Sequence, residues 1–503
     1  REALERDKVK PELLLPRLEE LADWLKKTRA QLSRPSNEDA EVRRLKSRAA
    51  QLLADGEFEQ AMDALRSVRR QLRESRRRIE ERLQDEVEGL RSHMAEEAIA
   101  TGRLAELALA RFDYDGAADL FSEAAECLPA TDRLGLWRMR LRQAEALYRK
   151  GDERGDQGAL TLAIAAYNDA LRIVSVAENP IEFAATTSGL GNVLCRTGEA
   201  EGAGERLAES VTAYRRALLP VVREKEPRLW ALTNLQLARA QSILAERSNA
   251  AAPHREASDA YRKALEVLTR ETAATDWALA QLGLGNALLG LEEFEPGRQL
   301  LAEAAQAFAE ALTILSRERS SSEWATAQMN LGNALLGLGE LEGLSARLED
   351  AVAAYRQALK VFTREAAPRK WALAQMNLAN ALASLGDRDP SATSRIEEAI
   401  LSYGLALEIF TREAEPLRWA ICQMNLGTAL IRLGERKDKR QHWLSVAAAM
   451  VPALEVFEAE GATDYADLTR RNLRKFHEQW EQLIGGVAGE APSTRPRLSA
   501  KAR

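Results

Sequence analysis

The residues whose types and spacing could do chemistry are side-chain amides and methionines that recur along the chain. An amide carries both donors and acceptors, so a row of amides can hold a peptide backbone whatever its sequence. Methionine is flexible and accommodates apolar partners of varied shape. Counted from a recurring aromatic residue, the columns fall four, five, six and nine positions later. They are Gln328 and Gln375 (with Gln281 and Gln423), then Met329, Met376 and Met424, then Asn330, Asn377 and Asn425, then Asn192, Asn286, Asn333 and Asn380.

Two interpretations of these columns are open. In the first, the side chains line a groove that takes a peptide or protein ligand, and we treat them as the candidate binding residues. In the second, the amides hydrogen-bond to neighbouring helices and the methionines belong to the core. Residue type and spacing are compatible with both, because an amide can satisfy a neighbouring side chain as well as a ligand.

Catalytic chemistry has little support in the sequence. None of the four histidines, His93, His254, His442 and His477, lies in a metal-ligand motif or next to a cysteine. No nucleophile elbow, phosphate-binding loop or kinase motif occurs. We therefore predict a protein that is not an enzyme and has no cofactor or metal.

The cysteines indicate a cellular compartment. Cys127, Cys195 and Cys422 are far apart and form no CxxC pair. This pattern favours a reducing, cytoplasmic environment over a disulfide framework. We expect Cys195 and Cys422 to be buried and unreactive, because they fall within segments expected to pack.

The elements that must position these residues are set by a long internal repeat. Its aromatic column recurs at intervals of 46 to 48 residues, and a second aromatic column follows about thirty residues behind the first. The first column is Trp137, Phe183, Trp230, Trp277, Trp324, Trp371, Trp419 and Tyr465. The second column is Tyr167, Tyr214, Tyr261, Phe308, Tyr355 and Tyr403. We expect the first column to pack between repeats.

Each repeat predicts two helices. The first begins near a proline, as at Pro180, Pro227, Pro368 and Pro416, because the first helical turn does not need that N–H. We expect it to end at a glycine such as Gly339 or Gly386. A glycine column inside this helix, Gly191, Gly285, Gly332 and Gly427, predicts close approach of a neighbouring helix. The second helix has an apolar stripe at Ala351, Tyr355, Ala358 and Leu359.

The segment Asn330-Leu-Gly-Asn-Ala-Leu, followed by Ala351, Tyr355 and Ala358, resembles the tetratricopeptide (TPR) repeat. The resemblance implies an all-α fold, a right-handed superhelical solenoid of antiparallel helix pairs whose groove binds protein. In that family the Met and Asn columns commonly face the groove. The period here is longer than the usual 34 residues. Long-period arrays of this kind resemble those of bacterial proteins in which an effector domain, a protease, TIR or NTPase domain, precedes the array.

The chain divides into four predicted parts. Residues 1–100 form a helical extension with a degenerate TPR-like hairpin, 101–136 a standard-length unit, 137–482 the long-period array, and 483–503 a disordered tail. Eight arginines crowd the extension between Arg66 and Arg82. They are either a solvated helix face, as the interleaved glutamates suggest, or a nucleic-acid patch.

Charge and hydropathy narrow the function further. The formal net charge of -6 provides no general attraction to nucleic acid or anionic lipid, and no apolar run is long enough to span a bilayer. The sequence predicts a protein-binding scaffold or sensor. The first alternative is the regulatory array of a larger effector whose catalytic domain lies before Arg1 and is itself the partner. The second is nucleic-acid binding through Arg66–Arg82.

Overall fold

The computed structural model describes residues 19, 22–23, 26–32, 40–248, 250–389, 391–437 and 440–485. They are almost entirely helical, and no strand occurs among them. The chain forms two compact units. Unit 1 comprises Arg1–Leu107 and Leu120–Leu136, and unit 2 comprises Ala108–Asp119 and Trp137–Arg503. The predicted tail at 483–503 lies outside the described residues except for the end of the last helix, at Gly485.

The helices are α3 (Ala40–Ala54), α4 (Phe58–Ala110), α5 (Tyr114–Cys127), α6 (Arg133–Arg154), α7 (Gln157–Leu171), α8 (Pro180–Glu201), α9 (Gly204–Ala217), α10 (Pro220–Lys225), α11 (Pro227–Arg247), α12 (Ala251–Leu265), α13 (Ala274–Glu292), α14 (Arg298–Leu312), α15 (Ser321–Glu342), α16 (Ser345–Ala358), α17 (Pro368–Arg388), α18 (Thr393–Leu407), α19 (Pro416–Lys437), α20 (Arg440–Ala459) and α21 (Thr463–Gly485).

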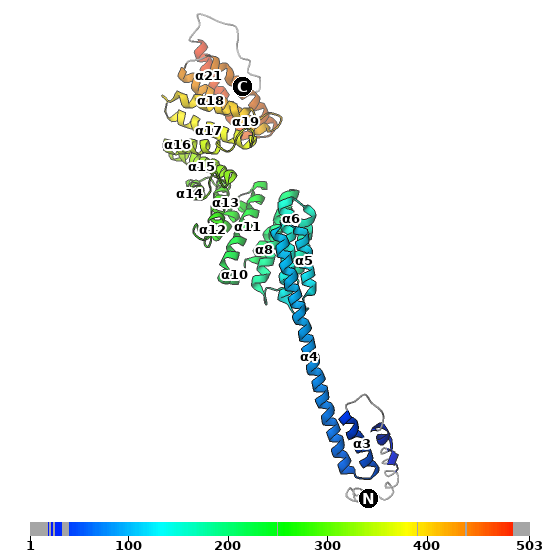
Figure 1. Cartoon of the computed structure of the whole chain (residues 1–503). Coiled ribbons are helices and arrows are strands. Elements are labelled where there is room, and N and C mark those ends of the chain that lie inside the picture. The colour runs from blue at the N-terminus through cyan, green and yellow to red at the C-terminus, as the bar shows by residue number, and fades with distance from the viewer. Residues whose placement is uncertain are drawn as a thin grey trace, which may run out of the picture. The chain divides into compact units, whose positions relative to one another are not determined.

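Unit 1 is built on the long helix α4. A turn at Gly56, whose φ of 80° is a left-handed conformation suited to glycine, lets α3 lie beside the first turns of α4 (Figure 1). Buried alanines such as Ala49 and Ala61 allow this close approach. From Arg76 to His93 every residue of α4 is exposed. The predicted boundary between residues 100 and 101 falls inside this continuous helix.

Unit 2 is a row of antiparallel helix pairs (Figure 1). The first helices are α8, α11, α13, α15, α17 and α19, and each packs on the second helix that follows it, α9, α12, α14, α16, α18 and α20. Each second helix also packs on the first helix of the next pair, as α14 does on α15. The first helices of neighbouring pairs contact one another directly, from α8 to α21. The array is therefore a TPR-like solenoid of the kind that the repeat predicted.

The first helices begin at the predicted prolines, but they end later than the sequence predicted. Pro180, Pro227, Pro368 and Pro416 are the first residues of α8, α11, α17 and α19. The prediction that Gly339 and Gly386 end their helices is wrong, because α15 continues to Glu342 and α17 to Arg388. Gly339 is buried, and a Cβ there would lie 2.7 Å from Leu348. The helix ends instead at Gly343, whose φ is 69°.

The glycine column inside the first helices is confirmed as a site of close approach. A Cβ at Gly332 would lie 2.7 Å from the ring of Tyr355, and one at Gly191 would lie 2.6 Å from the ring of Tyr214. The rings are fully buried, and no other residue would leave room for them. In three pairs, α8–α9, α13–α14 and α15–α16, an aromatic ring of the second helix is thus seated on a glycine of the first, whereas the side chain opposite Gly427 is Met450.

The first aromatic column packs between repeats, as expected. Trp277, Trp324 and Trp419 each contact two successive core clusters and so join the cores of neighbouring pairs. The indole nitrogen of Trp137 on α6 donates a hydrogen bond of 2.8 Å to the hydroxyl of Thr186 on α8. Tyr465 departs from the column, since it is 43% exposed and stacks on Phe457.

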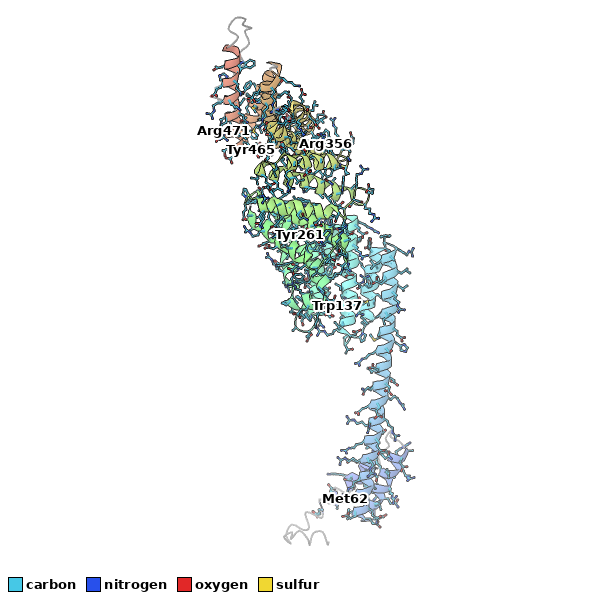
Figure 2. All side chains as sticks on the ribbon, turned by 90° about the vertical axis from the view of Figure 1, so that its left-hand side faces the viewer. Met62, Trp137, Tyr261, Arg356, Tyr465 and Arg471 are labelled. Atoms are coloured by element: carbon cyan, nitrogen blue, oxygen red, sulfur yellow. The ribbon has the colours of Figure 1, made fainter. Side chains whose placement is uncertain are left out.

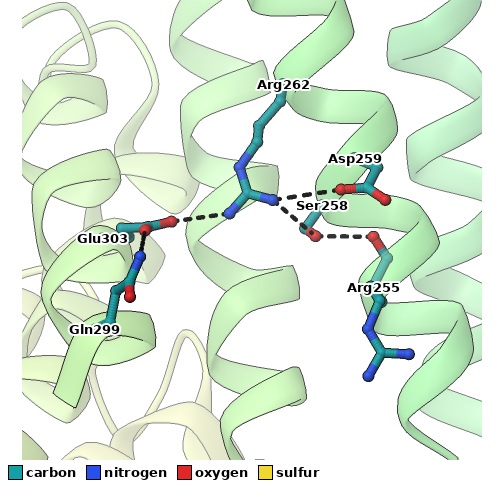
Figure 3. Close-up of polar contacts among 6 residues, drawn as sticks. All are labelled: Arg255, Ser258, Asp259, Arg262, Gln299 and Glu303. Atoms are coloured by element: carbon teal, nitrogen blue, oxygen red, sulfur yellow. Dashed lines mark hydrogen bonds and ion pairs between the residues drawn. The ribbon is translucent and has the colours of Figure 1, made fainter. Parts of the chain in front are cut away.

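The second helices are joined from pair to pair by ion pairs. Arg262 of α12 contacts Glu303 of α14 at 2.8 Å, and Gln299 donates a hydrogen bond to the same carboxylate (Figure 3). Similar pairs link α9 to α12 and α16 to α18, through Arg215–Glu256 at 2.9 Å and Arg356–Glu398 at 2.6 Å. Arg356 is labelled in Figure 2. These three contacts are called the ion-pair ladder below.

Candidate binding face

The residues of each first helix that can contact a partner are identified by their positions in the repeat. Residues 2, 6, 9, 13 and 16 positions after the aromatic residue fall within an arc of roughly 80°, because the helix turns by about 100° per residue. In α15 these positions include Thr326, Asn330 and Asn333, all only partly buried. Since the first helices contact one another, these arcs form one continuous surface, which we call the first-helix face.

The methionine column does not reach this face. Met329 and Met376 are 8% and 9% exposed and belong to one core cluster, and Met424 is 3% exposed in another. These three residues therefore form core contacts. Gln328 and Gln375 are partly buried.

The asparagines of the two columns form hydrogen bonds from one repeat to the next. Asn330 donates to Asn286 at 2.8 Å, Asn377 donates to Asn333 at 2.9 Å, and Asn425 donates to Asn380 at 3.1 Å. Each bond joins the sixth-position amide of one first helix to the ninth-position amide of the preceding one. Asn472 continues the series by donating to Thr428 at 3.3 Å. These contacts are called the amide ladder below.

Tyrosines of the second helices orient the ladder. Tyr355 donates to Asn333 at 2.8 Å, and Tyr403 donates to Asn380 at 2.6 Å. Burial raises the pKa of the Tyr355 hydroxyl well above its usual value, so the group stays protonated and acts as a donor. At Asn286 the equivalent ring belongs to Phe308, which has no hydroxyl to donate.

The ladder ends toward the N-terminus of the array. Asn192 accepts from Tyr214 at 2.8 Å, but the ninth position of α11 is Arg239, which pairs with Glu199 at 3.1 Å. The structure therefore brings six of the predicted asparagines into bonds with one another and leaves Asn192 bonded only within its own pair. The amides therefore connect neighbouring repeats of the stack.

A row of acidic residues on this face was missed by the sequence interpretation. Sixteen positions after each aromatic residue stands a carboxylate, in the last turn of the helix or directly after it. The row is Glu153, Glu199, Glu246, Glu293, Glu340, Asp387, Glu435 and Glu481. Counting from the same aromatic column would have revealed it. A carboxylate at a helix C-terminus is locally unfavourable, because it faces the negative end of the helix dipole.

Parts of the acidic row are neutralised and parts are not. Asp387 contacts Arg432 at 2.7 Å, and Glu199 contacts Arg239. Within the described residues, Glu246, Glu293 and Glu340 form no ion pair with lysine or arginine. The middle of the first-helix face therefore carries uncompensated negative charge.

Other chemistry finds no support in the described part of the chain. No three histidine, cysteine, aspartate or glutamate side chains there are arranged to hold a metal ion. Burial raises the pKa of the Cys195 thiol to about 11 and that of the Cys422 thiol to about 12, as expected for unreactive cysteines. Among the helices that the structure describes, none combines the length and apolar character needed to cross a membrane.

The arginine cluster of α4 is exposed and interleaved with carboxylates. Arg76 contacts Glu80 at 2.7 Å and Arg77 contacts Glu81 at 2.9 Å, each within the helix. Hydrogen bonding to Glu80 raises the pKa of Arg76. These pairs match the interpretation of a solvated helix face.

No model of a known protein family matches the chain, and no characterised protein matches its sequence. Among solved structures, the chain is similar to the C-terminal part of a TPR repeat-containing protein from Cytophaga hutchinsonii, at 14% identity and a TM-score of 0.38, covering 61% of this chain and 94% of that one. It is also similar to the apo form of RapI, at 12% identity and a TM-score of 0.41, covering 76% and 98%. A Rap protein complexed with competence and sporulation factor has 12% identity and a TM-score of 0.33, covering 77% and 99%. The assignment of a TPR-like solenoid rests on the helix pairs described above.

Proposed function

We propose that the array is a non-catalytic scaffold or sensor whose first-helix face binds a segment of another protein. The observation that carries this proposal is the spare hydrogen-bonding capacity of the amide ladder. Its side chains are oriented by the stack, partly exposed, and repeated at a regular spacing. The free cysteines fit a reducing compartment such as the cytoplasm.

The spare capacity can be assigned to particular atoms. Asn380 accepts from both Tyr403 and Asn425, and its amide nitrogen donates to no described residue. The Oδ1 atoms of Asn377 and Asn425 accept from no described residue. The ladder thus presents both donors and acceptors in fixed orientations, which reduces the entropy that a bound backbone must lose.

The acidic row supports a partner with basic side chains. Glu246, Glu293 and Glu340 lie along the edge of the first-helix face at the C-terminal ends of α11, α13 and α15, where the helix dipoles add to their negative potential. A lysine- or arginine-containing segment lying along the amide ladder would compensate this charge. Such complementarity raises the association rate and selects among partners.

Capture of partners from the native host, followed by mass spectrometry, tests the proposal. The test variant replaces Asn330, Asn333 and Asn377 with alanine, and the matched control replaces the second-helix amides Gln299, Gln306 and Gln357 with alanine. We expect the first-helix variant to lose the partner that the control and the unchanged chain retain. Retention of the same partner by the folded fraction of the first-helix variant would show that these asparagines act only in the stack.

The chemistry of the partner is tested separately. Replacing Glu246, Glu293 and Glu340 with glutamine removes charge without removing any bond of the amide ladder. We expect this variant to bind the captured partner more weakly at low salt and to show a smaller decrease in affinity as salt is raised. Unchanged affinity and unchanged salt dependence would exclude the acidic row from the interface.

A further inference from the structure

The long helix α4 carries apolar side chains where nothing in the described chain covers them. Leu72 and Val87 are each 40% exposed, Ile79 is 65% exposed, Leu83 59% and Leu90 61%. In Figure 2 the side chains of this part of α4 project freely on all sides. A helix gains most of its stability from packing an apolar face, so a bare stretch of this length is marginal by itself.

These apolar residues lie on one side of α4. At about 100° per residue, the positions of Leu72, Ile79, Leu83, Leu90 and Met94 fall within an arc of roughly 60°, and Val87 widens it to about 80°. The stripe therefore has the width of a seam that packs against one other helix. Toward the start of α4 the same stripe continues to Val68, which is buried in the α3 hairpin.

The stripe is symmetric about Leu83. Ile79 and Val87 each lie four residues from it, and Leu72 and Met94 each lie eleven residues from it. In an antiparallel pair of identical helices related by a two-fold axis at Leu83, each of these residues faces an apolar residue of the other copy. Such a self-complementary surface is the mark of a two-fold interface.

The charges change sign about the same residue. Residues 66–82 contain eight arginines and three glutamates, whereas residues 84–100 contain five carboxylates and one arginine. Arg70, Arg78 and Arg82 form no ion pair among the described residues. A parallel pair would place the basic segments together, whereas an antiparallel pair places the basic segment of each copy beside the acidic segment of the other.

We propose that residues 72–94 of α4 form an antiparallel two-helix interface with the same segment of a second copy of this chain, with Leu83 at the two-fold axis. Leu90 is the one member of the stripe without an apolar counterpart. Its position opposite is Arg76, whose aliphatic stem covers apolar surface while its guanidinium stays in water. The interface is independent of the first-helix face, so a failure of either proposal leaves the other standing.

Light scattering of the full chain tests the oligomeric state. We expect a mass twice the 55.7 kDa of one chain, and a Leu83→Glu variant with the mass of one chain. Leu83 is already exposed, so the substitution leaves the fold of the single chain unperturbed. The matched control is Leu401→Glu on α18, a residue 68% exposed, which is expected to retain the doubled mass. A single-chain mass for the unchanged protein, or a doubled mass for Leu83→Glu, overturns the proposal.

Cross-linking tests the orientation. When Leu72→Cys and Met94→Cys chains are mixed and oxidised, we expect disulfide-linked peptides that join position 72 of one copy to position 94 of the other. Leu72→Cys alone should give no link between its two copies, since an antiparallel arrangement separates them. A 72–72 link, which a parallel pair would give, overturns the proposal.

Discussion

The two sides of the array are joined from repeat to repeat by different chemistry. First helices are joined by neutral hydrogen bonds of the amide ladder, such as Asn377 to Asn333, supported by buried tyrosine hydroxyls. Ion pairs add to these bonds at two places, Arg239–Glu199 and Arg432–Asp387. Second helices are joined by the exposed ion-pair ladder, such as Arg262 to Glu303, whose side chains are 44% and 39% exposed. The first helices also contact one another directly, and aromatic rings seat on their glycines.

This difference teaches which side of the array depends on close packing. A half-buried amide leaves a costly unpaired group when its partner is removed, whereas an exposed ion pair is replaced by water at little cost. The first-helix side should therefore be sensitive to small steric and polar changes and the second-helix side tolerant of them. Four substitution experiments test the contrast, in order of decreasing expected effect.

The largest difference is expected between two glycines. Gly332→Ala on α15 places a Cβ 2.7 Å from the Tyr355 ring and should destabilise the array by about 1–3 kcal/mol. Gly404→Ala on α18 meets nothing within 4 Å and should stabilise it by about 0.5–1 kcal/mol, because alanine favours the helix. Denaturant midpoints measured by circular dichroism compare the two. Equal midpoints for the two variants would show that close packing at Gly332 does not make the first helices more sensitive to an added side chain.

The next largest effect is expected at Asn333. Alanine there removes the acceptor of both Tyr355 and Asn377 and leaves a buried hydroxyl unpaired, at a cost of about 1–3 kcal/mol. Hydrogen exchange should show the loss of protection centred on α15 and α17. A variant as stable as the unchanged chain would mean that the ladder adds no net stability.

A smaller effect is expected from exchanging tyrosine and phenylalanine in the second aromatic column. Tyr355→Phe loses one hydroxyl bond and should cost about 1 kcal/mol, while Phe308→Tyr supplies a hydroxyl for Asn286 and should cost nothing or stabilise. The double variant tests whether the two changes add. Equal destabilisation by both single substitutions would show that ring packing, not the hydroxyl, decides the difference.

The smallest effect is expected in the ion-pair ladder. Arg262→Gln should change stability by less than about 1 kcal/mol, and high salt should remove the difference. Hydrogen bonds from Gln299 and Arg262 hold the pKa of Glu303 below its usual value. The contribution of Glu303 is therefore present at neutral pH and lost as the pH falls through its folded-state pKa. Denaturant unfolding at neutral and at acidic pH measures the contribution of Glu303. If Arg262→Gln destabilised the chain as much at high salt as at low salt, the predicted salt dependence would be wrong.

Much of the fold was open to sequence analysis because its signals are local. The aromatic columns, the prolines at the helix starts and the mid-helix glycines each predicted a feature that the structure contains. The error at Gly339 has a local cause as well. A glycine needed for close approach looks the same in sequence as a glycine that ends a helix, and only the position of Leu348 separates them.

The candidate site was less accessible to the sequence. The asparagine columns were found, yet their pairing joins the sixth position of one repeat to the ninth of another, about 44 residues away. That offset depends on how far each first helix is shifted against the next. The methionines were open to two interpretations because a helix position five residues after the tryptophan faces either core or groove according to how the neighbouring helix packs.

The sequence by itself determined the helix-pair repeat, its period and the residue types in each column. It did so because burial leaves a periodic pattern of apolar, small and aromatic residues along each helix. Only the tertiary structure decided that Asn333 meets Asn377, that Met329 is core, and that Leu83 stays uncovered. These properties depend on contacts between residues far apart in the chain, and the periodicity of a single helix contains no information on what lies opposite it.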